Sequence, residues 1–93
     1  MAENVAALLT ISGKVQGVFF RVETQKAARG YGVTGWVRNL ADGTVEALAE
    51  GERNRVDALI DWCQRGAPMS RVDRVDVEAR DYSGSYDSFE VTY

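Results

Sequence analysis

Apolar and polar side chains alternate along several stretches of this chain, and each such stretch predicts a strand. Between residues 5 and 11 the odd positions are Val, Ala, Leu and Ile, which is the pattern of a mostly buried strand. The stretches 45–49, 75–79 and 89–93 alternate in the same way, and 33–40 is a further expected strand. In 75–79 charged residues occupy the intervening positions, so we expect one face of that strand to be exposed to solvent.

Two other stretches carry apolar residues at the spacing of a helix. The first forms a stripe whose members are Phe20, Thr24, Ala27, Ala28 and Tyr31. The second is the clearer amphipathic helix, and its stripe consists of Val56, Leu59, Ile60 and Cys63. The predicted helix ends are marked by Gly30 and Gly32 in the first case and by Gly66 and Pro68 in the second. Because Cys63 belongs to the second stripe, we interpret it as a packing residue and not as a nucleophile.

The predicted elements follow the order strand, helix, strand, strand, helix, strand, with a short terminal strand. Residues 41–44, Ala-Asp-Gly-Thr, carry turn chemistry and predict a hairpin between the second and third strands. This order is typical of an α+β fold, the ferredoxin-like βαββαβ sandwich, in which two helices cover one face of an antiparallel sheet. Residues 1–4 are predicted as a loose tail and Gly51 as a break. No linker is visible, so residues 1–93 are expected to form one domain.

Composition and charge exclude several classes of function. The chain of 93 residues has no histidine and a single cysteine, so the commonest metal ligand is missing and no Cys/His cluster is available to hold zinc. The net charge is −3 without any block of like charge, which argues against a nucleic-acid partner. We find no apolar run long enough for a membrane span and no signal peptide, and a lone cysteine fits a reducing compartment. The sequence therefore predicts a cytoplasmic protein without membrane contact.

The loop between the first strand and the first helix is the main candidate for chemistry. It belongs to a segment that reads Gly13-Lys14-Val15-Gln16-Gly17-Val18-Phe19-Phe20-Arg21. A loop that enters a helix presents unpaired backbone N–H groups and the positive end of the helix dipole, which together attract an anion. Gly13 and Gly17 permit a backbone that turns these groups inward, and the planar guanidinium of Arg21 can hold two phosphate oxygens. The spacing does not match a nucleotide-binding Walker A loop, and a tight loop with a surface arginine is the alternative explanation.

A second group of residues lies in the second predicted strand and reads Gly35-Trp36-Val37-Arg38-Asn39. Since this strand is expected to end close to the loop, Asn39 is a candidate to face a bound anion and to position a water molecule with its amide. The alternative is an ordinary asparagine near a turn. Arg38 is expected on the opposite face of the strand from Asn39, and Trp36 in or near the core.

Together, the two motifs resemble the signatures of the acylphosphatase family, and the resemblance covers almost the whole chain. It implies an enzyme that hydrolyses the carboxyl–phosphate bond of acyl phosphates to a carboxylate and inorganic phosphate, without metal or cofactor. It also implies that Arg21 binds the phosphoryl group and that Asn39 orients the attacking water. The backbone loop around the phosphoryl group would then comprise Val15, Gln16, Gly17, Val18, Phe19 and Phe20. The family's members are small and mostly monomeric, and we expect inorganic phosphate or sulfate to bind at the same site.

Other functions occur on this fold class, so the fold alone does not decide between them. An RNA-binding sheet needs exposed aromatic residues on its central strands, whereas the first and third predicted strands offer Leu8, Thr10, Glu46 and Leu48. A non-catalytic phosphate-binding or regulatory module is the remaining alternative. The presence of both Arg21 and Asn39 favours the enzyme, because a binding module has little use for an amide that orients water.

Overall fold

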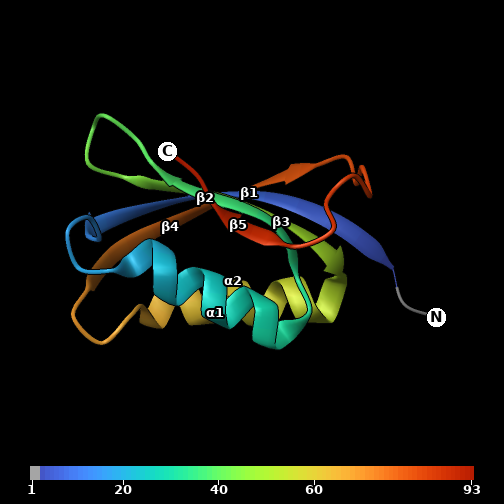
Figure 1. Cartoon of the computed structure of the whole chain (residues 1–93), viewed down its shortest axis with the longest axis horizontal. Coiled ribbons are helices and arrows are strands. Elements are labelled where there is room, and N and C mark those ends of the chain that lie inside the picture. Colours follow the sequence, from blue (N-terminus) through green and yellow to red (C-terminus); the bar gives the residue numbers. More distant parts are fainter. Residues whose placement is uncertain (1–2) are drawn as a thin grey trace.

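Two helices cover one face of a five-stranded sheet in the computed structural model, which describes residues 3–93 (Figure 1). The elements in chain order are β1 (Asn4–Lys14), α1 (Phe20–Tyr31), β2 (Thr34–Asn39), β3 (Val45–Glu52), α2 (Arg53–Arg65), β4 (Arg71–Arg80) and β5 (Phe89–Val91). Every predicted strand and helix is present, in the predicted order. The predicted tail is wrong at Asn4, which already belongs to β1, and its residues 1–2 lie outside the described residues.

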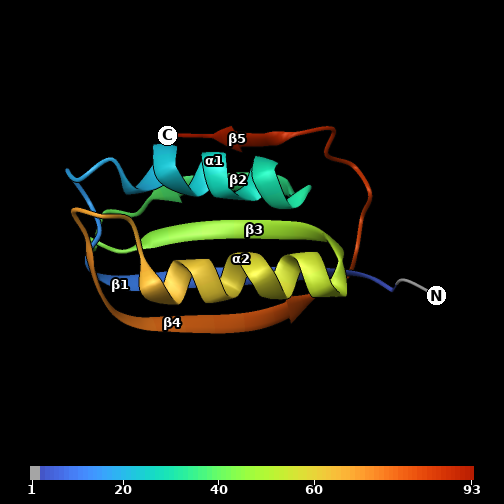
Figure 2. The same cartoon turned by 90° about the horizontal axis from the view of Figure 1, so that it is seen from below.

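The strands lie in the order β4-β1-β3-β2-β5, which Figure 2 shows from one edge of the sheet to the other. Neighbouring strands are antiparallel except at one edge, where β5 runs parallel to β2. Of the three inner strands, β1 and β3 are the most apolar, and they contribute the fully buried Leu9, Ile11, Val45 and Ala47. The edge strand β4 instead alternates charged residues with small apolar ones, and such charges discourage pairing with a further strand.

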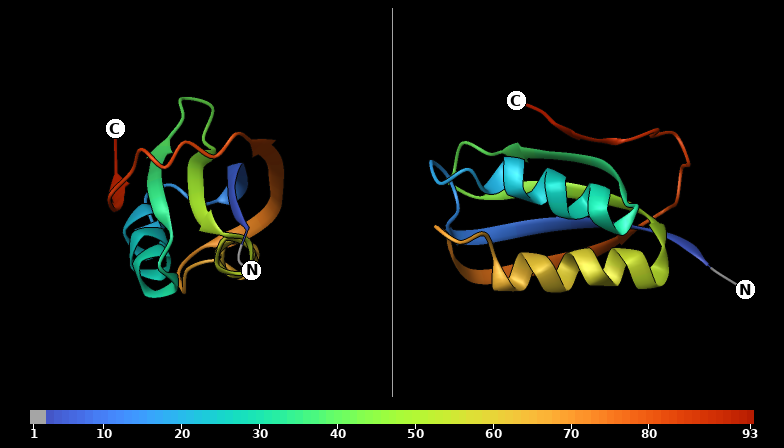
Figure 3. Two further views of the ribbon diagram at one scale, coloured as in Figure 1. Left: turned by 90° about the vertical axis from the view of Figure 1, so that its right-hand side faces the viewer. Right: turned by 60° about the horizontal axis from the view of Figure 1, so that its bottom comes forward.

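The core fills the space between the sheet and the two helices, which form separate layers in Figure 3. The buried helix residues are Phe20, Thr24 and Ala28 of α1 and Val56, Leu59 and Cys63 of α2. These residues belong to the two predicted stripes, so the spacing identified the buried faces. Burial raises the pKa of the Cys63 thiol to about 12, so the thiol stays protonated and packs as an apolar group. The interpretation of Cys63 as a packing residue is confirmed.

The prediction that Trp36 packs in or near the core is wrong. Its neighbour Val37 is fully buried on the helix-covered face, so the alternation of β2 places Trp36 and Arg38 on the other face of the sheet. There, Cζ of Arg38 lies 5.1 Å from the centroid of the Trp36 ring, and Trp36 Nε1 donates to the Tyr86 hydroxyl at 3.3 Å. Arg38 also forms an ion pair with Glu46 at 2.6 Å, so its charge is neutralised on this face.

The same face holds a buried carboxylate, Glu50 of β3, which is only 1% exposed. Its oxygens accept hydrogen bonds from the backbone N–H of Ser83 at 3.1 Å, from the Ser83 hydroxyl at 2.9 Å and from the N–H of Gly84 at 3.1 Å. Glu50 thereby fastens the connection between β4 and β5 to the sheet. Each of these donors is satisfied by the carboxylate, which offsets the cost of burying its charge.

One boundary and the exposure of one strand differ from the sequence-based expectation. Gly51, predicted as a break, continues β3 with φ 152°, and α2 begins only at Arg53. Strand β4 is exposed along most of its length, including Val77, because it is an edge strand. Neither helix in 3–93 is long and apolar enough to cross a membrane.

Candidate functional site

The site follows a β-bulge near the end of β1. The pairing of β1 with β4 shifts its register between Ser12 and Gly13, and Gly13 has φ 132°. A Cβ atom at residue 13 would lie 2.1 Å from the carbonyl oxygen of Arg71, so a side chain does not fit there. The bulge bends the strand and turns the chain toward the loop that precedes α1.

The loop of residues 15–20 leaves a row of backbone N–H groups unbonded. None of the backbone N–H groups of residues 15–20 donates a hydrogen bond to another group within residues 3–93. Gly17 with φ 75° and Phe19 with φ 60° bend the chain into the N-terminus of α1. Free N–H groups at a helix N-terminus carry partial positive charge, so this loop is suited to bind an anion.

Buried apolar side chains anchor the loop at both of its ends. Val15 and Phe20 are each 1% exposed, and the Phe20 ring lies 5.7 Å, centroid to centroid, from the ring of Trp62 in α2. Val18 is half-buried and packs against the core between them. These contacts fix the course of the backbone, so the N–H groups need little reorganisation to receive a ligand.

The side chain of Gln16 ties the loop to the turn between β2 and β3. Its Nε2 donates to the carbonyl oxygens of Leu40 and Thr44, both at 2.8 Å. The sequence identified Gln16 only as part of the backbone cradle. No pattern of neighbouring residues predicts the contacts of its side chain, because the two acceptors lie 24 and 28 residues further along the chain.

Asn39, the last residue of β2, reaches the same cavity as the loop. The cavity has a volume of about 220 Å³ and is lined by Val15, Gly17, Phe19, Phe20, Arg21, Val22 and Asn39. The side-chain oxygen Oδ1 of Asn39 is buried and has no hydrogen-bond partner in the described part of the chain. Buried polar atoms are rarely left without a partner, so this oxygen is available to a bound molecule. The two sequence motifs thus meet in one place, although Gln16 and Val18 do not line the cavity.

Arg21, in the first turn of α1, is held by the end of the chain. Its Nη1 donates to the carbonyl oxygen of Thr92 at 3.1 Å, and its Cζ lies 4.8 Å from the centroid of the Tyr93 ring. Thr92 donates its N–H and its hydroxyl to the carbonyl of Val37, at 2.8 and 3.3 Å. No carboxylate of residues 3–93 pairs with Arg21, so its positive charge is available to an anion. This contact could not be predicted from a local motif, since Thr92 lies 71 residues from Arg21 along the chain.

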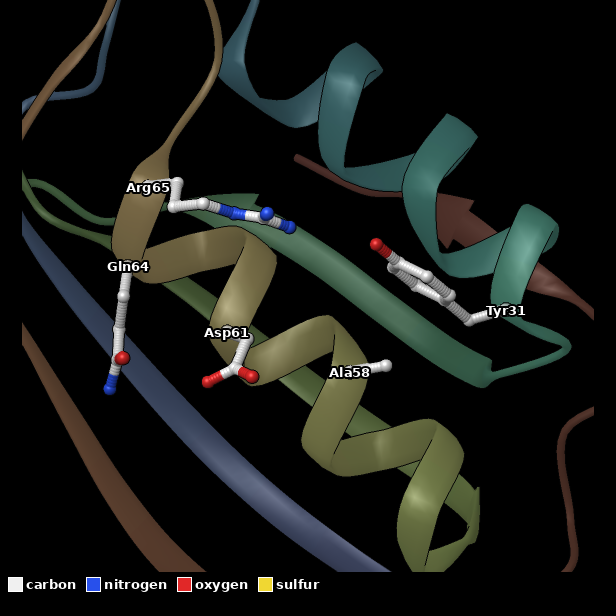
Figure 4. Close-up of a pocket in the computed structure, with 5 residues that line it drawn as sticks. All are labelled: Tyr31, Ala58, Asp61, Gln64 and Arg65. Atoms are coloured by element: carbon white, nitrogen blue, oxygen red, sulfur yellow. The ribbon is translucent and has the colours of Figure 1, made fainter.

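A larger cavity of about 370 Å³ lies between the helices, and Figure 4 shows the residues that line it. It is bordered by Tyr31 at the end of α1 and by Ala58, Asp61, Gln64 and Arg65 of α2. The loop precedes the first residue of α1, whereas Tyr31 is its last, so this cavity is separate from the anion site. No cluster of three or more His, Cys, Asp or Glu side chains suited to a metal occurs within 3–93, and the absence of a cofactor stays a prediction.

Sheet and helices together define a ferredoxin-like fold, with a candidate anion site at the start of its first helix. The acylphosphatase family model matches residues 7–91. An acylphosphatase of Pelotomaculum thermopropionicum is 48% identical over 87 residues, which cover 94% of this chain and 95% of that protein. An acylphosphatase of Anaeromyxobacter dehalogenans is 50% identical over 93 residues, which is 100% of both chains.

The fold is also shared with a solved structure. An acylphosphatase from Coxiella burnetii matches this chain with a TM-score of 0.91 and 40% identity, over 96% of this chain and 93% of that one. The chain therefore belongs to the acylphosphatase family of hydrolases. This result confirms the predicted family, enzyme class and ferredoxin-like fold, while the individual roles of Arg21, Asn39 and the loop stay predictions.

Proposed function

We propose that this protein hydrolyses the carboxyl–phosphate bond of acyl phosphates and that it needs no metal ion to do so. The proposal is carried by the meeting of three kinds of group in one cavity: free backbone N–H groups, the guanidinium of Arg21 and the unpaired Oδ1 of Asn39. The first two suit a phosphoryl group, and the third suits a water molecule. Family membership supports the same reaction, because the relatives are named acylphosphatases.

The phosphoryl group is bound by the loop backbone and Arg21. The N–H groups of residues 15–20 donate to its oxygens, and the positive end of the α1 dipole adds to their attraction. Thr92 occupies one donor atom of Arg21, Nη1, and the remaining N–H groups of the fork are free for two phosphoryl oxygens. Inorganic phosphate and sulfate carry the same oxygens, so both are expected to compete with the substrate.

The attacking water is oriented by Asn39, whose Oδ1 accepts a hydrogen bond from it. The water oxygen forms a bond to phosphorus while the bond between phosphorus and the acyl oxygen breaks, and the electron pair leaves with the carboxylate. A carboxylate is a weak base, because its conjugate acid has a pKa of about 4, so the leaving group needs no protonation by an acid. One proton of the water passes to a phosphoryl oxygen and the other stays on the attacking oxygen, so inorganic phosphate carries both and no histidine base is required. Positioning and charge stabilisation carry most of the catalysis in such a transfer.

A direct assay separates this proposal from a non-catalytic phosphate-binding module. The purified protein is incubated with benzoyl phosphate in excess EDTA, and loss of substrate is followed. We expect turnover well above the uncatalysed rate. Binding of inorganic phosphate by calorimetry, combined with no turnover, would instead support the binding module. A rate that disappears in EDTA and returns with a divalent cation would contradict metal independence.

Two variants separate binding from turnover. Arg21→Ala is expected to lose both phosphate affinity and activity, because it removes the charge that holds the phosphoryl group. Asn39→Ala is expected to keep phosphate affinity and lose turnover. Arg74→Ala and Asn54→Ala are matched controls, because both side chains are exposed and lie outside the cavity. Normal phosphate affinity in Arg21→Ala would refute the role proposed for this arginine.

A further inference from the structure

Phe19 combines two features that do not favour folding. It is the one non-glycine residue with positive φ among residues 3–93, at φ 60° and ψ 22°. Side chains of L-residues rarely adopt this left-handed conformation. The side chain is also 77% exposed, so its ring gains little from burial in the core. A strained backbone that holds an apolar ring in solvent indicates that the ring serves a ligand.

The lining of the site cavity has a buried inner part and an exposed rim. Phe20 is 1% exposed and Oδ1 of Asn39 is buried, so these residues belong to the inner wall. Phe19 and Val22, which are 77% and 42% exposed, belong to the rim. Arg21 is the one charged residue in the lining, so the rim itself is apolar.

The rim is the side toward which the acyl group leaves. In phosphoryl transfer the attacking and leaving oxygens lie roughly in line, on opposite sides of phosphorus. The proposed function, on which this inference rests, places the water at Asn39 on the inner wall. The acyl group therefore extends outward, past Phe19 and Val22.

We infer that Phe19 and Val22 form an apolar subsite for the acyl group, and that the protein prefers acyl phosphates with an aromatic or otherwise bulky apolar acyl group. A planar ring stacks against the Phe19 ring in an offset or edge-to-face arrangement. An acetyl group is too small to cover the rim. A charged acyl group loses hydration there without gaining a partner.

The test compares kcat/KM for benzoyl phosphate with kcat/KM for acetyl phosphate. Dividing the ratio of each variant by that of the parent removes the difference in intrinsic reactivity between the two substrates. Phe19→Ala is expected to lower the ratio about three- to tenfold, and Val22→Ser about twofold, through lost apolar contact. Phe19→Trp keeps a ring at the rim and should retain the preference. Met69→Ala is the matched control, because Met69 is 72% exposed and lies outside the cavity.

The outcomes separate this subsite from the proposed function. If the parent hydrolyses both substrates and neither Phe19→Ala nor Val22→Ser changes the ratio, the subsite is wrong and the hydrolytic function stands. If the parent hydrolyses neither substrate, the proposed function itself fails. Calorimetry of the parent with benzylphosphonate and methylphosphonate tests the subsite without turnover or variants. Tighter binding of benzylphosphonate supports the subsite, and equal affinity for the two compounds contradicts it.

Discussion

The buried carboxylate of Glu50 and the buried amide oxygen of Asn39 lie at opposite ends of the β2–β3 ladder, and they differ in their hydrogen bonds. Glu50 pairs with Thr34 at one end, and its carboxylate accepts hydrogen bonds from the Ser83–Gly84 segment. Asn39 pairs with Val45 at the other end, and its buried Oδ1 accepts none among residues 3–93. A buried group whose hydrogen bonds are satisfied within the protein stabilises the fold, whereas an unsatisfied one is available to hydrogen-bond a bound molecule. The comparison therefore predicts a role in stability for Glu50 and supports the role proposed for Asn39.

The largest expected effect is the loss of activity in Asn39→Ala. Removing the acceptor that orients the water should lower kcat about 10²–10³-fold, as for the loss of one preorganised hydrogen-bonding group in other hydrolases. The free energy of unfolding should stay the same or rise slightly, because the variant removes an unsatisfied buried atom. Steady-state kinetics and urea unfolding measure the two quantities, with Asn54→Ala as the control. Large destabilisation of Asn39→Ala together with normal kcat would mean that Asn39, like Glu50, contributes to stability and not to turnover.

Glu50→Ala should show the opposite pattern. It leaves the N–H groups of Ser83 and Gly84 without their acceptor, so the free energy of unfolding should fall by about 2–3 kcal/mol. At a temperature where the variant remains folded, kcat should match that of the parent. Glu78→Ala is the matched control, because Glu78 is exposed on the edge strand β4. A normal midpoint in urea for Glu50→Ala would show that its hydrogen bonds add nothing to stability.

Gln16→Ala is expected to have intermediate effects on both quantities. Two hydrogen bonds to the β2–β3 turn are lost, which should cost about 1–2 kcal/mol of stability. Because the loop then loses its connection to the strand end that carries Asn39, kcat should also fall, by about tenfold. The same kinetic and unfolding measurements apply, with the exposed Gln64→Ala as control. Unchanged kcat in Gln16→Ala would mean that the loop keeps its position without this bridge.

The smallest expected effect is that of Tyr93→Ala. The ring contacts the Arg21 guanidinium at an exposed position, where such an interaction is worth about 0.5–1 kcal/mol. Losing it should raise KM for benzoyl phosphate about two- to fivefold, with little change in kcat. Tyr82→Ala, an exposed tyrosine that does not line the site cavity, is the control. A larger fall in kcat than rise in KM would indicate that Tyr93 affects the chemical step.

The sequence predicted the elements of the fold because their signals are local. Alternation and helical spacing are properties of neighbouring residues, and the stripe from Val56 to Cys63 is buried as its spacing predicts. The prediction failed for Trp36, because aromatic size suggested the core while the alternation of β2 decided the face. The positions on either side of it, Gly35 and Val37, are both buried and mark the core-facing side of β2.

The site was predicted in part for the same reason. The loop glycines and Arg21 form a continuous motif, and Asn39 could be added because hairpin topology brings the end of β2 to the loop. The side-chain bridge from Gln16 and the contact between Arg21 and Thr92 join residues far apart in the chain. No pattern of neighbouring residues reports such contacts, so they became visible only in the folded structure.

The Gln16 bridge has a consequence for how the protein moves. Its two hydrogen bonds join the loop before α1 and the turn between β2 and β3 into one mechanical unit. A ligand that reduces the backbone motion of the loop should therefore also reduce that of the turn, although the turn does not line the cavity. Amide hydrogen exchange should slow at residues 41–44 when inorganic phosphate binds, and this distant protection should vanish in Gln16→Ala.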